Sequence, residues 1–176
     1  MKFKAPAFLI ALALTAPLAL SAQADAPALP AAATADQATT SKLVYGLLSD
    51  SRYAYRPKVL DEAMSKDVFK RYLESLDAGK QFFTQADVSK FAPFEANIAE
   101  AIRGGQLEPA FQVFAVYRQR VAQRVGHARA LLKQEPDFST DERFEYDRKD
   151  VPWPASDAEL DELWRKSVKN DWLRLK

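Results

Sequence analysis

Hydrophobic residues recur every three or four positions along most of the chain beyond residue 40, with charged residues between them. This period is typical of amphipathic helices, because it places the apolar side chains on one face. The few strictly alternating stretches are short and lack the Asn-Gly or Asp-Gly turns that join strands into hairpins. We therefore expect an all-α fold, an irregular multi-helix domain built around one long central helix.

Helices of different lengths are expected before residue 80. The first covers about residues 36–49, and a bend with a short helix follows at Pro57, a residue that suits the first turn of a helix. Ser65 is placed to cap the next helix, and Gly79 to end it in the left-handed conformation that glycine adopts readily. The first helix presents four apolar residues, which are Leu43, Val44, Leu47 and Leu48.

The clearest helix start in the chain lies in the stretch FFTQADV. Thr84 and Asp87 have the spacing of a capping box, in which each side chain bonds the backbone of the other residue. Phe83 and Val88 have the spacing of a hydrophobic staple. We expect one helix that continues from here to the pair Gly104-Gly105 and is bent at its internal proline.

The longest helix is expected at about residues 107–134. At about 1.5 Å per residue it spans on the order of 40 Å, long enough to form the backbone of the domain. Its apolar stripe consists of Leu107, Phe111, Phe114, Val121, Val125, Ala128 and Leu132. We expect the internal core to contain Tyr72, Leu73, Phe83, Phe111 and Phe114.

The stretch ELDELWRKSVKNDWLRLK, residues 159–176, predicts a terminal amphipathic helix after an irregular connector rich in charge and proline. Ser156 and Glu159 have the spacing of a second capping box. Either the apolar face of this helix packs back on the domain, or the chain is expected to be the front part of a longer protein. We expect an interaction surface formed by Leu160, Leu163, Trp164, Val168 and Trp172.

The first 24 residues have the features of a cleavable secretory signal peptide. Lys2 and Lys4 precede an apolar run, and Ala22-Gln23-Ala24 is a small-x-small cleavage site. An uncleaved membrane anchor is the alternative. Residues 25–39, rich in Ala, Pro and Thr, are expected to form a flexible lead-in, and residues 40–176 the helical domain. The chain has no cysteine, which fits export to an oxidising compartment.

Composition and motifs exclude several kinds of chemistry. Loss of the two leader lysines changes the formal net charge from +1 to −1, so no basic field favours nucleic acid. His127 is the single histidine, and the chain has no G-x-S-x-G, P-loop or dinucleotide-binding motif. We expect no catalytic residue, metal ligand or cofactor. Arginines make the second half of the long helix basic. They form either a phosphate or carboxylate site or a solvated or interface face. These residues are Arg118, Arg120, Arg124 and Arg129.

Several segments occur in the order found in one protein family. These are the stretch YLESLD, an aromatic pair, a helix start at QAD, and an R-x-x-x-P-W-P connector that leads into L-x-x-L-W. In this order they resemble the N-terminal region of the tail-specific, or carboxy-terminal processing, serine proteases of Gram-negative bacteria. The resemblance covers nearly all of residues 40–176.

The resemblance implies a front domain of a periplasmic endopeptidase. In that family the terminal helix leads into a PDZ module, which binds the apolar C-termini of substrates, and a protease core with a Ser-Lys dyad. No serine or lysine of this chain matches the dyad, so the chain is expected to end before both modules, as a fragment, a truncated frame or a split gene, and to be inactive alone. The implied partners are those modules, protein substrates and a lipoprotein adaptor.

Two other classes of function remain open from the residues alone. A free-standing exported helical protein could act as an adaptor, chaperone or inhibitor. An enzyme complete within the chain has the lone histidine and the absent motifs against it.

Overall fold

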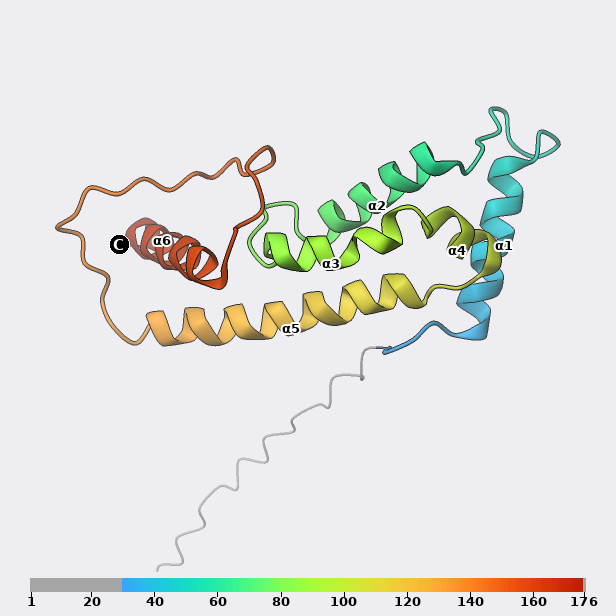
Figure 1. Cartoon of the computed structure of the whole chain (residues 1–176). Coiled ribbons are helices and arrows are strands. Elements are labelled where there is room, and N and C mark those ends of the chain that lie inside the picture. Colours follow the sequence, from blue (N-terminus) through green and yellow to red (C-terminus); the bar gives the residue numbers. More distant parts are fainter. Residues whose placement is uncertain (1–29, 176) are drawn as a thin grey trace, which may run out of the picture.

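A computed structural model describes residues 30–175 of the chain, and the predicted signal peptide lies outside this range. The described residues form six α-helices and no strand, which confirms the all-α fold (Figure 1). Helix α1 already begins at residue 35, so the last part of the predicted lead-in is helical. The helices are α1 (Ala35–Ser49), α2 (Glu62–Leu76), α3 (Gln85–Glu95), α4 (Ile98–Gly104), α5 (Glu108–Leu131) and α6 (Asp157–Leu175).

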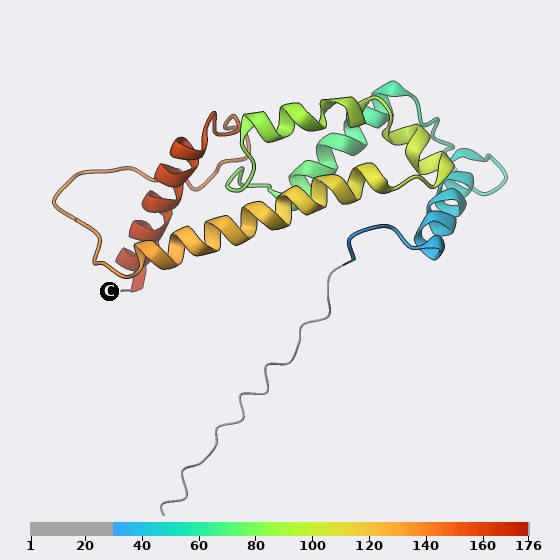
Figure 2. The same ribbon diagram turned by 60° about the horizontal axis from the view of Figure 1, so that its bottom comes forward.

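The domain is elongated, with α1 at one end and α6 at the other (Figures 1 and 2). Helix α5 runs along most of its length, as expected for the longest helix, and its 24 residues span about 36 Å. Helices α2, α3 and α4 pack on one another beside the first half of α5, while α6 packs across its second half. Among the described helices, α1 packs mainly against α4.

The core lies where α2, α3, α4 and the first half of α5 meet. Of the predicted core residues, Leu73 and Phe83 are buried, whereas Tyr72, Phe111 and Phe114 are half-buried. The Tyr72 hydroxyl donates a hydrogen bond to the Ala110 carbonyl, 2.7 Å away, across the α2–α5 contact. The buried core cluster consists of Phe69, Leu73, Phe83, Phe91, Ile98 and Val113.

The start of α2 differs from the prediction. Residues 57–61 are not helical, and Asp61 caps α2 by accepting the Met64 amide at 2.8 Å. Ser65 lies inside the helix, buried, where its Oγ accepts the Ala99 amide from the start of α4 at 3.2 Å. The predicted cap at Ser65 was therefore wrong, because Asp61 satisfies the first amides one turn earlier.

The turn from α2 to α3 is organised by a single buried carboxylate. Asp77 accepts three amide hydrogen bonds, at 2.7 to 2.9 Å, from the consecutive residues 81–83. The left-handed residue in this turn is Lys80, with φ 50°, and not Gly79 as predicted. These bonds fix the direction in which the chain enters α3.

The capping box at the start of α3 is confirmed. The Thr84 Oγ1 accepts the Asp87 amide at 3.3 Å, and the Asp87 carboxylate accepts the Thr84 amide at 3.1 Å. The single helix expected from here to residue 103 is instead two helices, because α3 ends at residue 95 and a turn precedes α4. Asn97 in that turn donates through its side chain to the Pro93 carbonyl, 3.0 Å away.

Helix α4 ends at Gly104 and is capped by Gly105, which has a left-handed φ of 69°. A Cβ atom at this position would lie 2.8 Å from the Ala38 carbonyl oxygen of α1. The glycine therefore allows α1 and the end of α4 to approach closely. Helix α1 has no buried residue, and its apolar residues Leu43, Leu47 and Leu48 are more than half exposed.

Candidate interaction surface

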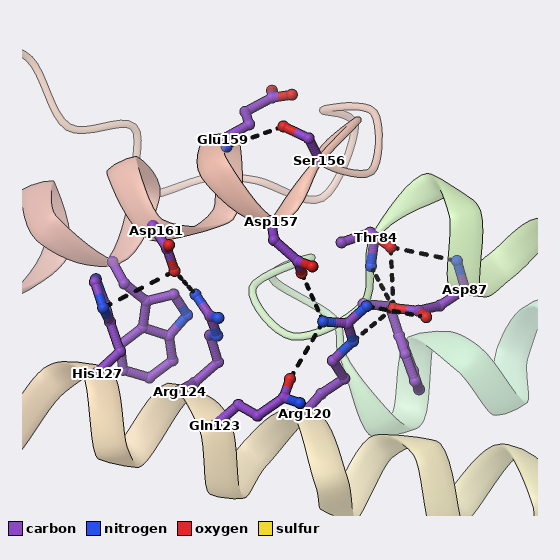
Figure 3. A network of polar contacts seen from close by, with 12 residues as sticks. Thr84, Asp87, Arg120, Gln123, Arg124, His127, Ser156, Asp157, Glu159 and Asp161 are labelled. Atoms are coloured by element: carbon purple, nitrogen blue, oxygen red, sulfur yellow. Dashed lines mark hydrogen bonds and ion pairs between the residues drawn. The ribbon is translucent and has the colours of Figure 1, made fainter.

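Helix α6 is held in place at its start by the predicted cap. The Glu159 amide donates to the Ser156 Oγ at 3.2 Å, and the Glu159 carboxylate accepts from the Ala155 amide at 2.7 Å (Figure 3). The return bond therefore reaches one residue further back than in a standard capping box. The cap fixes where the connector ends and α6 begins.

The five residues predicted as an interaction surface have different environments. Leu160 is fully buried and belongs to the interior packing of the domain. Trp164 is half-buried, donates through its indole to the Gln81 carbonyl at 2.7 Å, and meets the Phe82 ring edge to face at 5.7 Å. Leu163, Val168 and Trp172 are half-buried. The first half of α6 is thus the anchor, and the second half keeps apolar surface in contact with solvent.

This exposed surface lines a groove between the second halves of α5 and α6. The groove has a volume of about 570 Å³. Three of the five predicted surface residues line it, together with residues from the end of α5 that the sequence pattern had placed on a separate apolar stripe. Its lining is Ala128, Leu132, Trp164, Val168, Asp171, Trp172 and Leu175.

Two arginines of α5 join this helix to its neighbours. The Arg120 guanidinium donates from Nε and Nη2 to the two oxygens of Asp87, at 2.8 and 3.1 Å, and from Nη1 to Asp157 at 2.6 Å (Figure 3). Arg120 therefore connects the capping box of α3 to the first turn of α6. Planar, bidentate pairing of this kind fixes geometry as well as charge.

One helical turn further on, Arg124 pairs with Asp161 of α6. The His127 Nδ1 lies 3.9 Å from the same carboxylate (Figure 3). Of the four arginines that suggested a phosphate or carboxylate site, these two bind carboxylates of the chain itself. Arg118 and Arg129 are exposed.

Burial and pairing act in opposite directions on Asp87. Burial alone would raise the pKa of its carboxyl, but the hydrogen bonds from Arg120 and Thr84 outweigh burial and hold the pKa below its ordinary value. The same pairing with Asp87 raises the pKa of Arg120. Both groups are therefore charged at neutral pH, and their ion pair is part of the contact between α3 and α5.

A third cluster attaches the connector to α6. Glu142 accepts hydrogen bonds from Arg165 and from Lys169, whose Nζ lies 2.5 Å away. These two bonds lower the pKa of Glu142 to about 2. The Lys169 ammonium also lies over the Phe138 ring at 5.7 Å from its centre. The connector is thus fixed to α6 by charged contacts.

Within residues 30–175, no group of three or more His, Cys, Asp or Glu side chains is arranged to bind a metal ion. No described helix is both long and apolar enough to cross a membrane. The geometry brings together an apolar groove and a set of internal ion pairs. Sequence reasoning missed the groove because its two walls come from helices that were considered separately, although both walls were present as apolar stripes.

The fold and the groove define the class of protein: an all-helical domain with a solvent-exposed apolar groove between two of its helices. The family described as the tail specific protease N-terminal domain matches residues 47–176, and the chain belongs to this family. The chain is 32% identical, over 123 residues, to the tail-specific protease of Haemophilus influenzae (strain ATCC 51907 / DSM 11121 / KW20 / Rd). The alignment covers 69% of this chain and 18% of that protein, so the chain spans about a fifth of the length of this curated relative. The resemblance read from the sequence is thus confirmed.

Proposed function

We propose that the chain acts as the N-terminal helical domain of a periplasmic tail-specific serine endopeptidase, which degrades or processes proteins from their apolar C-termini. The observation that supports this proposal is the family match over residues 47–176. The leader-like first 24 residues motivate the periplasmic location. Sequencing the N-terminus of the exported protein tests the cleavable signal peptide, because cleavage after Ala24 leaves Asp25 first, whereas an intact Met1 indicates the uncleaved anchor.

In this proposal the chain provides scaffold and a docking surface, and the chemistry belongs to the PDZ and protease modules. A Ser-Lys dyad needs a lysine whose pKa is lowered by burial, so that it can accept the proton of the serine. The lysines of α6 are instead near carboxylates, such as Lys169 at Glu142 and Lys166 at Glu162. The half-exposed residues Val168 and Trp172 support a docking role, because they leave apolar surface uncovered.

A reconstitution assay tests the role. The chain is mixed with the PDZ and protease modules of the same family, expressed separately as one polypeptide from the same genome. The substrate is an unstructured protein that ends in apolar residues. We expect no cleavage by the chain alone and a changed cleavage rate when the chain is added to the modules.

Two variants provide the matched comparison. Trp172→Ala removes groove surface and should reduce the effect of the chain on cleavage, whereas Leu48→Ala on the exposed face of α1 should not. Cleavage by the chain alone would contradict the assignment of chemistry to the other modules. No effect of the chain on the modules would contradict the scaffold role and favour a free-standing adaptor, chaperone or inhibitor.

A further inference from the structure

The groove continues along α5 as an apolar strip. With 100° between successive residues, Val121, Val125, Ala128 and Leu132 lie within about 60° of one another on the helix surface. The buried face that carries Arg120 and Arg124 lies beside this strip on one side. Val125 is 39% exposed and Leu132 53% exposed, so the strip is open to solvent. The strip and the groove together form a continuous apolar track with the second half of α6 as one wall.

The other edge of this track carries positive charge. Arg118, Arg129 and Lys133 lie within about 60° of one another on the same projection, directly beside the strip and away from α6. All three are exposed, and none pairs with a carboxylate among the described residues 30–175. Arg120 and Arg124, by contrast, pair with carboxylates of the domain itself.

We propose that this track binds an amphipathic helix of a separate partner protein, one with an apolar ridge and an acidic flank. The apolar ridge would fill the groove, and the acidic flank would pair with Arg118, Arg129 and Lys133. This proposal rests on the docking role proposed above and names the chemistry of one partner. It needs neither the PDZ module nor the protease module.

The shape of the track favours a helix over an extended peptide. A peptide that binds by strand addition needs a sheet edge for its backbone N–H and C=O groups, and the described residues contain no strand. A helix satisfies these groups internally and presents only side chains to the apolar track. From Val121 to Leu132 the strip extends over about 17 Å, or about 11 residues of helix, so a helix of about 18 residues covers it fully.

The exposed helix α1 of a second copy does not match this description. Helix α1 has an exposed apolar face, but its only acidic residue is Asp36, and it also carries Lys42. It therefore has no acidic flank to meet three cations. Charge complementarity instead selects a partner whose helix is acidic along one side.

The test uses two synthetic helical peptides of about 18 residues. Both carry the same leucine ridge at positions i, i+3, i+4 and i+7, and they differ only in a flank of glutamates or of lysines. Trp164 and Trp172 line the groove, so the fluorescence of the purified chain reports binding. We expect the glutamate peptide to bind at least tenfold more tightly, which is about 1.4 kcal/mol. This preference should decrease at high salt because the cations are exposed.

Variants of the chain locate the binding. Replacing Arg118, Arg129 and Lys133 together by glutamine should weaken the glutamate peptide, should not weaken the lysine peptide, and should thereby remove the tenfold preference. Leu132→Ala should weaken both peptides. The matched control is Lys90→Gln, which removes an exposed, unpaired cation of α3 outside the track and should change neither affinity.

Several outcomes would overturn the proposal. These are equal binding of both peptides, no binding of either, or an unchanged affinity in the triple glutamine variant. Concentration-dependent self-association that Leu132→Ala abolishes would show that a second copy occupies the track instead. Because the peptide assay contains no protease modules, its failure would leave the reconstitution result intact, and failure of reconstitution would leave peptide binding intact.

Discussion

Replacement of Arg120 by methionine tests how the domain holds α3, α5 and α6 together. The Asp87 side chain is only 5% exposed and that of Arg120 16%, so the variant leaves a buried carboxylate without its cation. Breaking a buried pair by removing one partner typically costs about 3–5 kcal/mol. Asp87 retains its hydrogen bonds with Thr84, so we expect the lower value, about 3 kcal/mol. Methionine keeps most of the apolar stem of the arginine in place.

Urea unfolding followed by tryptophan fluorescence measures this cost, with the free energy of unfolding obtained by linear extrapolation. Asp157→Asn is the control, because it removes the other partner of Arg120, whose side chain is 62% exposed. The control should lose at most about 1 kcal/mol. If Arg120→Met costs no more than Asp157→Asn, the buried pair does not stabilise the domain as argued here.

The same variant should show a characteristic pH dependence. In the wild type, the pKa of Asp87 lies below its ordinary value of 3.8, so the pair stabilises the fold above that pH and its contribution is lost as the pH falls further. Without Arg120, burial raises the pKa of Asp87. Protonation of Asp87 at low pH then removes the cost of an unpaired buried carboxylate in the variant. The stability difference between variant and wild type should therefore shrink as the pH falls from 7 towards about 4. A constant difference would refute the assignment to Asp87.

Two further predictions follow from burial and from the connector. Leu160→Ala should cost about 2–5 kcal/mol in urea unfolding because the side chain is fully buried, and a loss below about 1 kcal/mol would contradict its place in the interior. Glu142→Gln should increase hydrogen exchange in the connector at neutral pH without changing global stability. In the wild type, the pKa of Glu142 is lowered from 4.5 to about 2, so hydrogen exchange in the connector should increase only as the pH falls through this range. Equal exchange in both proteins at pH 7 would refute the role of Glu142.

Features set by neighbouring residues could be predicted from the sequence. The capping box of Thr84 and Asp87 and the cap at Ser156 both depend on side chains within three residues of the bonds they make. The helical period likewise reports a local geometry, which is why the fold class and the longest helix were predicted correctly. These signals do not depend on what packs against the helix.

Where two nearby residues could cap the same helix or form the same turn, the sequence pattern did not predict which residue does so. Asp61 and Ser65 are both good caps, but Asp61 caps α2 one turn earlier, and the Ser65 hydroxyl accepts the Ala99 amide instead. The left-handed residue of the α2–α3 turn is Lys80 because Asp77 draws the following amides towards itself. That contact outweighs the conformational freedom of Gly79.

The inner face of α5 could not be predicted from its apolar stripe. Hydrophobicity selected a stripe that includes Val125 and Leu132, which are exposed, whereas Arg120 and Arg124 face the interior. Their partners are 33 and 37 residues away in the chain, so no window of sequence contains both members of a pair. The exposed stripe then became one wall of the groove.

The arginines on the inner face of α5 also determine the register of α6. Apolar side chains still make contact when one helix slides along another, but hydrogen bonds to a carboxylate require a particular atom at a particular distance. A shift of α6 by one turn would separate Arg120 from Asp157 and Arg124 from Asp161 at the same time. Helix α6 therefore has one permitted position along α5, and a partner bound to the groove meets its two walls always in the same alignment.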